Sequence, residues 1–198
     1  MDKKLLPKNF FKDNPLDPLS VAQIAYFSMT VGFEEKIQNM VQDVLNGAFA
    51  SGRKAQIEAE AAEISRLETG DETVKFMRSG YDIVNREILC KKALTMQAEV
   101  MPPMLRRLRT SFQEKFVETA IYTLAHAEQA YVDQLIEMYP EIRNPYAQSM
   151  ACLVFGVQER EDTIELLLRD YKRLKKDYPG ESYCQGPLLA IYVLCGEM

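Results

Sequence analysis

The residue types on which enzymes most often depend are scarce in this chain of 198 residues. It contains a single histidine, His126, and no tryptophan. One histidine excludes the H-E-x-x-H motif of zinc proteases and the two Glu-x-x-His pairs of a di-iron helical bundle. His126 lies at a predicted helix end, where a protonated imidazole interacts favourably with the helix dipole. We therefore expect a capping role for it rather than catalysis.

The motifs that hold metals, cofactors or nucleotides are also missing. The four cysteines, at positions 90, 152, 184 and 195, are scattered, and no two form a C-x-x-C pair. The sequence has no G-x-x-x-x-G-K-[ST] loop and no G-x-G-x-x-G motif after a strand pattern. The densest acidic stretch, residues 58–72, lacks the spacing of an EF-hand, and we interpret it as a solvated helix face. We predict no catalytic residue, no cofactor and no metal site.

Long hydrophobic runs are absent as well. The longest, residues 188–195, is far shorter than the roughly 20 residues that span a bilayer, and the N-terminus has no apolar run of signal-peptide length. The charge balance of 24 Lys and Arg against 29 Asp and Glu gives a net charge of −5, which argues against a general nucleic-acid binder. The sequence predicts a cytoplasmic protein with reduced thiols and no membrane contact.

Apolar residues recur at three- and four-residue spacing along most of the chain, which predicts an all-α fold. In the N-terminal half, we expect a helix that Asp17 caps and that runs to Gly32, and a second over about 33–45. An alanine-rich, peripheral helix is expected over 53–68. A further helix, capped by Asp71, is expected to run to residue 100 with a weak point at Ser79 and Gly80.

Pro102 and Pro103 form the clearest internal boundary. Proline lacks an amide hydrogen and pushes the preceding residue out of helical geometry, so we expect a helix to end here. This boundary divides the chain into an N-terminal helical layer, residues 1–101, and a region of helical hairpins, residues 102–198. The two parts are expected to form one continuous domain.

Residues 111–198 alternate between helix patterns and short turns. Ser111 and Glu114 fit a capping box, and helices follow over about 116–124, 131–139, 145–157, 164–178 and 183–195. Tyr146-Ala147-Gln148 recurs 37 residues later as Tyr183-Cys184-Gln185, and Ile121-Tyr122 precedes Val154-Phe155 by 33 residues. In this spacing the segment resembles stacked helical hairpins of the HEAT-like α-solenoid kind. An irregular helical bundle is the alternative.

The last predicted helix is apolar on every side across residues 188–195. Such a helix must be covered all round. We expect the cover to come from the same chain, with the N-terminal segment around Phe10 and Phe11 among the candidates. A second copy of the chain is the alternative, which makes Leu189 and Val193 candidates for a homo-oligomer contact.

A basic cluster follows the two prolines and consists of Arg106, Arg107 and Arg109. We expect it close to a helix start, where positive charge opposes the helix dipole and so points to a use. The three arginines could bind phosphate groups or an acidic partner. Ion pairs with the acidic residues 58–72 are the simpler interpretation.

These patterns favour a non-enzymatic scaffold or adaptor that binds another protein along a helical surface. One alternative is a nucleic-acid binder that uses Arg106, Arg107 and Arg109, although the negative net charge argues against it. The other alternative is an enzyme built on carboxylates and tyrosines that borrows a metal or a cofactor.

Overall fold

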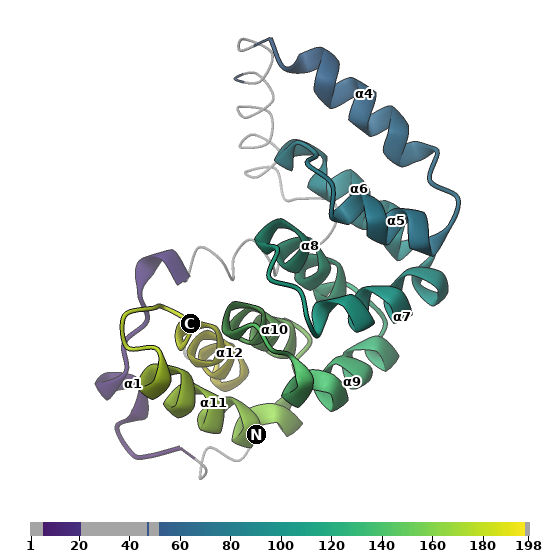
Figure 1. The fold of residues 1–198 in the computed structure, drawn as a ribbon. Helices are drawn as coiled ribbons and strands as arrows, with labels where there is room; N and C mark the ends of the chain where they lie inside the picture. Colours follow the sequence, from purple (N-terminus) through teal and green to yellow (C-terminus); the bar gives the residue numbers. More distant parts are fainter. Residues whose placement is uncertain (1–5, 21–46, 48–51, 197–198) are drawn as a thin grey trace.

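The described part of the chain is helical throughout. The computed structural model describes residues 6–20, 47 and 52–196, which contain no strand, so the predicted all-α class is confirmed (Figure 1). The helix predicted over 33–45, and most of the one that Asp17 was expected to cap, lie outside these residues. The α-helices are α1 (Phe10–Asp13), α4 (Lys54–Ser65), α5 (Gly70–Met77), α6 (Arg86–Leu94), α7 (Gln97–Leu108), α8 (Glu114–Ala125), α9 (Gln129–Met138), α10 (Pro145–Val157), α11 (Ile164–Asp177) and α12 (Gln185–Cys195). Short 3-10 turns, η2 (Ile83–Asn85), η3 (Tyr139–Glu141) and η4 (Glu161–Thr163), precede α6, follow α9 and precede α11.

Alternate helices pack against one another in series: α4 on α6, α6 on α8, α8 on α10, and α10 on α12. Figure 1 shows this row from α4 at one end to α12 at the other. Helices joined by short loops run antiparallel, so every second helix has the same direction. Asn144 before α10 donates a hydrogen bond of 3.1 Å to the carbonyl oxygen of Ser111 before α8, and Gln158 after α10 donates one of 2.7 Å to that of Ala125 at the end of α8. The N-terminal ends of these helices therefore lie along one edge, which we call the N-terminal edge.

The expected helix end at Pro102 and Pro103 is wrong, because α7 runs through both prolines. Each proline fixes φ near the helical value, but it loses its own hydrogen bond and its ring crowds the carbonyl group four residues earlier. Packing compensates, since Val100, Met101 and Met104 have no exposed surface. A β-carbon on Gly70 of α5 would lie 2.2 Å from the carbonyl oxygen of Glu99, so only glycine permits this close contact with α7. The expected boundary at residue 102 thus falls inside a helix.

Two other local expectations in this half are wrong. The single helix expected from Asp71 to residue 100 is divided into α5, α6 and α7, with one break at the expected Ser79–Gly80 and another before Gln97. The cap of α5 is Thr69 rather than the expected Asp71. The Thr69 hydroxyl accepts from the amide of Glu72 at 3.3 Å, and the Glu72 carboxylate accepts from the amide of Thr69 at 3.1 Å. This capping box satisfies the free amides of the first turn.

The C-terminal helices follow the predicted pattern closely. Asn144 caps α10 by accepting from the amide of Tyr146 at 3.0 Å. The capping box expected at Ser111 is wrong, because α8 starts at Glu114 after the cap residue Gln113, and the Ser111 hydroxyl accepts from the Gln113 amide instead. Ser111 lies two residues before the cap position and is therefore out of reach of the free amides of the first turn.

Helix α12 is covered by its own chain. It packs on α10 and α11, and the ring of Phe11 lies edge-on against Tyr192 with 4.6 Å between centroids. The Tyr192 hydroxyl donates to the carbonyl oxygens of Phe11 and Asn14, at 3.0 and 2.9 Å. Leu189 is fully buried, so it has no surface for a second copy, whereas Val193 is half-buried. Self-association through Val193 stays a prediction.

Candidate functional site: the N-terminal edge

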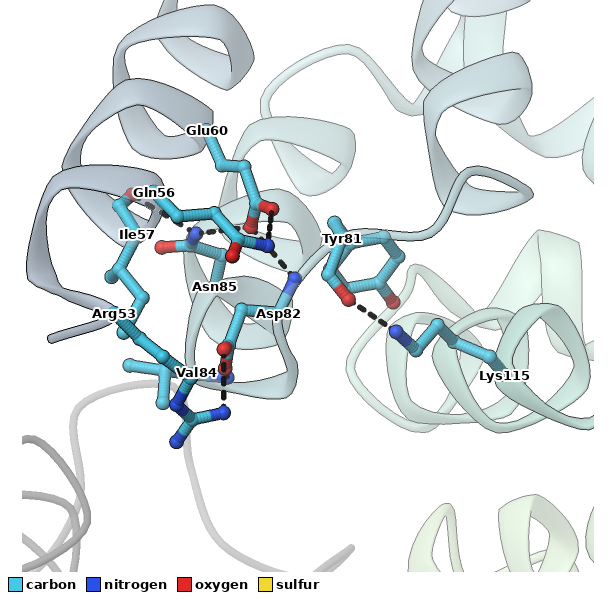
Figure 2. A network of polar contacts seen from close by, with 9 residues as sticks. All are labelled: Arg53, Gln56, Ile57, Glu60, Tyr81, Asp82, Val84, Asn85 and Lys115. Atoms are coloured by element: carbon cyan, nitrogen blue, oxygen red, sulfur yellow. Dashed lines mark hydrogen bonds and ion pairs between the residues drawn. The ribbon is translucent and has the colours of Figure 1, made fainter. Parts of the chain in front are cut away.

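One end of the N-terminal edge is a network of paired charges that joins α4 to the start of α6 (Figure 2). Arg53 forms an ion pair of 2.9 Å with Asp82, which is 8% exposed. The Glu60 carboxylate accepts from the amide of Asp82 at 2.7 Å and from the Asn85 side chain at 3.0 Å. Burial alone would raise the pKa of Glu60, but these hydrogen bonds, with one from Gln56, lower it below the usual value. The network clamps α4 in place.

The next helix continues this pairing. Lys115 of α8 donates to the carbonyl oxygen of Tyr81, and its ammonium group lies 4.7 Å from the centre of the Tyr81 ring, as Figure 2 shows. The Tyr81 hydroxyl forms a hydrogen bond with the hydroxyl of Thr119. Because these polar groups satisfy one another's hydrogen bonds, we interpret this end of the edge as a structural connection between helices.

An ion pair between a buried arginine and a half-buried glutamate occupies the middle of the edge. The Arg86 side chain, 8% exposed, contacts the Glu118 carboxylate at 2.5 Å. The other oxygen of Glu118 accepts from the hydroxyl of Tyr146 at 2.9 Å. Burial, and then the charges of Glu118 and Glu114, raise the pKa of Tyr146 well above its ordinary value. Tyr146 is therefore held as a neutral donor at the start of α10.

Beyond Tyr146, further aromatic side chains lie at the N-terminal edge. Tyr183, just before α12, lies 6.4 Å from Tyr146 between ring centres, and Tyr178, at the end of α11, lies 5.5 Å from Tyr183 and edge-on to it. All three rings are half-buried. We call these three tyrosines, with the exposed carboxylates of Glu114 and Glu181, the tyrosine patch.

The patch carries negative charge next to its rings. Burial raises the pKa of Tyr183, and the charges of Glu181 and Glu114 raise it further. Within the described residues, neither Glu114 nor Glu181 forms an ion pair. Sequence reasoning missed this patch. The available signal was the recurrence of Tyr146-Ala147-Gln148 at position 183, which the structure places at the starts of two neighbouring parallel helices.

The basic cluster is not where it was expected. Arg106, Arg107 and Arg109 lie at the end of α7, where positive charge is favourable, so the argument from an opposed dipole is wrong. Arg109 pairs with Glu141 at 2.7 Å, not with residues 58–72. Arg106 and Arg109 line a hollow of about 250 Å³ between α7 and α9, while Arg107 does not line it. The three guanidinium groups do not converge on one hollow.

His126 ends α8, as expected, but not as a charged cap. Burial lowers its pKa, and its ring lies edge-on to Tyr122 with 5.0 Å between centroids. Its Nε2 is buried with no hydrogen-bond partner among the described residues. The lowered pKa does not fit the expected protonated imidazole, because burial disfavours the charged form of histidine.

Cys90 and Cys152 form their hydrogen bonds with residues other than His126. Cys90 contacts Thr123 at 3.3 Å and Cys152 contacts the Tyr139 hydroxyl at 3.3 Å. Burial raises the pKa of each of these thiols to about 12. Such thiols are poor nucleophiles at neutral pH.

Among residues 6–20, 47 and 52–196, no three His, Cys, Asp or Glu side chains are grouped as metal ligands. Within the same ranges, no helix combines the length and apolar character needed to cross a bilayer.

Comparison of the chain with protein-family models, with curated proteins and with solved structures finds no match. The resemblance to HEAT-like repeats stays a prediction.

Proposed function

We propose that this protein is a non-enzymatic helical adaptor that binds another protein through the tyrosine patch. The observation that carries the proposal is the group of half-buried rings of Tyr146, Tyr178 and Tyr183, supplied by three separate elements. Tyrosine is enriched at protein interfaces because it combines a large apolar ring with a polar tip and loses little conformational entropy.

Rigid support strengthens the proposal. The hydroxyl of Tyr146 is fixed by Glu118, which is itself held by Arg86. The loop that carries Tyr183 begins with a turn in which the amide of Glu181 donates to the carbonyl oxygen of Tyr178 at 3.1 Å. Binding costs little conformational entropy when the rings are already held in position.

The surroundings favour a protein over a nucleic acid. Glu114 and Glu181 flank the rings, and carboxylates repel phosphate groups. The stacked helices fit the HEAT-like scaffold that we propose as the architecture. We also propose a cytoplasmic location, since Cys90, Cys152 and Cys184 are not joined in disulfides.

Affinity capture from the native host, followed by mass spectrometry, tests the adaptor function. The wild-type protein is expected to retain a small set of proteins that the double variant Tyr178→Ala/Tyr183→Ala loses. Tyr131→Ala is the matched control, because Tyr131 is a half-buried tyrosine of α9 outside the patch. Circular dichroism of all three verifies folding. Retention that the double variant leaves unchanged would contradict the proposal.

A further inference from the structure

The tyrosine patch combines aromatic rings with carboxylates that have no cation of their own. Glu181 and then Glu114 are the carboxylates whose charges raise the pKa of Tyr183. The cation that acts on Tyr146, Arg86, is paired with Glu118, and Lys175 donates to the Tyr171 hydroxyl at 2.9 Å. At the Tyr183 side of the patch, Glu114 and Glu181 therefore carry negative charge that no ion pair neutralises among the described residues.

Aromatic faces and carboxylates attract the same ligands. A ring holds an ammonium or guanidinium group over its face within about 6 Å of its centre. A carboxylate beside the ring adds a charge-assisted hydrogen bond, which is strongest with the forked guanidinium of arginine. This combination is complementary to basic side chains and repels acidic ones.

The spacing of the rings indicates more than one basic side chain. The ring centres of Tyr146 and Tyr183 are 6.4 Å apart, and those of Tyr183 and Tyr178 are 5.5 Å apart. In an extended peptide, residues i and i+2 point to the same side at a separation of roughly 6.6 Å. Each of the two ring-to-ring separations is therefore close to the separation of alternate side chains in an extended chain.

We propose that the tyrosine patch binds an extended basic segment of the partner protein, with Lys or Arg at alternate positions. The rings of Tyr146, Tyr178 and Tyr183 contact the cationic groups, and Glu114 and Glu181 neutralise their charge. This inference rests on the proposed adaptor function and specifies the chemistry of its partner.

Fluorescence anisotropy with a labelled peptide tests the inference directly. The probe is fluorescein-labelled Gly-Arg-Gly-Arg-Gly, and Gly-Glu-Gly-Glu-Gly is the opposite-charge control. The wild-type protein is expected to bind the arginine peptide and not the glutamate peptide. Tyr183→Ala and Glu114→Gln/Glu181→Gln are each expected to weaken binding by about tenfold, whereas Tyr183→Phe, which keeps the ring, is expected to bind as the wild type does.

A charge-matched variant separates the patch from the net charge of the protein. Glu63→Gln/Glu68→Gln removes two exposed carboxylates from α4 and the loop that follows it, away from the patch, and is expected to leave binding unchanged. If Glu114→Gln/Glu181→Gln and Glu63→Gln/Glu68→Gln weaken peptide binding equally, the attraction is nonspecific and the inference is overturned. Failure of the arginine peptide to bind would also overturn it.

The two proposals can fail separately. If the captured partner is lost in Tyr178→Ala/Tyr183→Ala but the arginine peptide does not bind, the adaptor function stands and the basic-segment inference is wrong. If the captured protein is a second copy of this chain, the partner chemistry proposed here is wrong as well.

Discussion

Gly186 of α12 lies directly against the main-chain carbonyl group of Ser149 on α10. A β-carbon at Gly186 would be 2.1 Å from that oxygen. A second close approach occurs further along the same two helices, where a β-carbon at Gly156 would be 2.9 Å from the Cα of Ala190. These glycines let two apolar helices pack with their backbones almost in contact.

Gly186→Ala is expected to lower the free energy of unfolding by about 1–3 kcal/mol, because the obstructing atoms belong to the main chain and cannot rotate away. Gly180→Ala is the matched control, since a β-carbon there meets nothing within 4 Å, and its effect should stay within about 0.5 kcal/mol. Urea unfolding followed by circular dichroism measures both. Equal stabilities would show that α10 and α12 are further apart than described.

The cover over α12 leads to a prediction about two neighbouring positions. Leu189→Asp is expected to unfold the protein, because it would place an unpaired charge at a fully buried site. Val193→Asp is expected to give a folded, less stable protein, since Val193 keeps part of its surface.

Light scattering on the wild type decides whether α12 also mediates self-association. We expect a monomer, because the N-terminal segment already occupies the Tyr192 side of the helix. A wild-type dimer that becomes a monomer in Val193→Asp would contradict this expectation.

The single histidine gives a pH test with a definite sign. Burial lowers the pKa of His126 below 6.5, so the unfolded chain binds the proton more tightly than the folded one. Stability is therefore expected to fall as the pH drops from about 6.5 through the folded pKa. A protonated helix cap would have a raised pKa and would produce the opposite slope.

Urea midpoints at about pH 7.5 and about pH 5.5 measure this slope. The wild type should be less stable at the lower pH, and His126→Asn should reduce the difference. A wild-type midpoint that rises on acidification would restore the charged-cap interpretation.

Thiol reactivity is expected to distinguish Cys184 from the other cysteines. Cys90, Cys152 and Cys195 are buried, whereas Cys184 is partly exposed. Burial raises the pKa of Cys184, so its reaction should be slow but present in the folded state. Titration with a chromogenic disulfide reagent is expected to show one slow thiol, which Cys184→Ser removes, and three more only in denaturant.

Much of the local structure could be predicted because its signals are short-range. The start of α10 at Pro145, the break at Ser79 and Gly80, and the apolar spacing of α8 to α12 each depend on residues within a turn or two. The prediction failed at Pro102 and Pro103, where the contacts of α5 and the buried methionines outweigh a local preference of about 3 kcal/mol per proline.

The candidate site could be predicted only in part, for the same reason. The two Tyr-x-Gln segments were visible as a recurrence, but Tyr178 and Glu114 come from other helices and have no pattern in common with them. The arginine cluster was visible too, yet its meaning depended on which end of a helix it occupied, and that was decided by whether α7 continued through the prolines.

The order of amino acids alone determined that this chain forms helices, roughly where most of the C-terminal ones begin and end, and that its last helix needs cover on every side. Only the tertiary structure decided what provides that cover, how far α7 extends and which side chains meet at the N-terminal edge. The physical reason is range: turns and caps are stabilised by neighbours along the chain, whereas burial and electrostatic pairing depend on residues that only folding brings together.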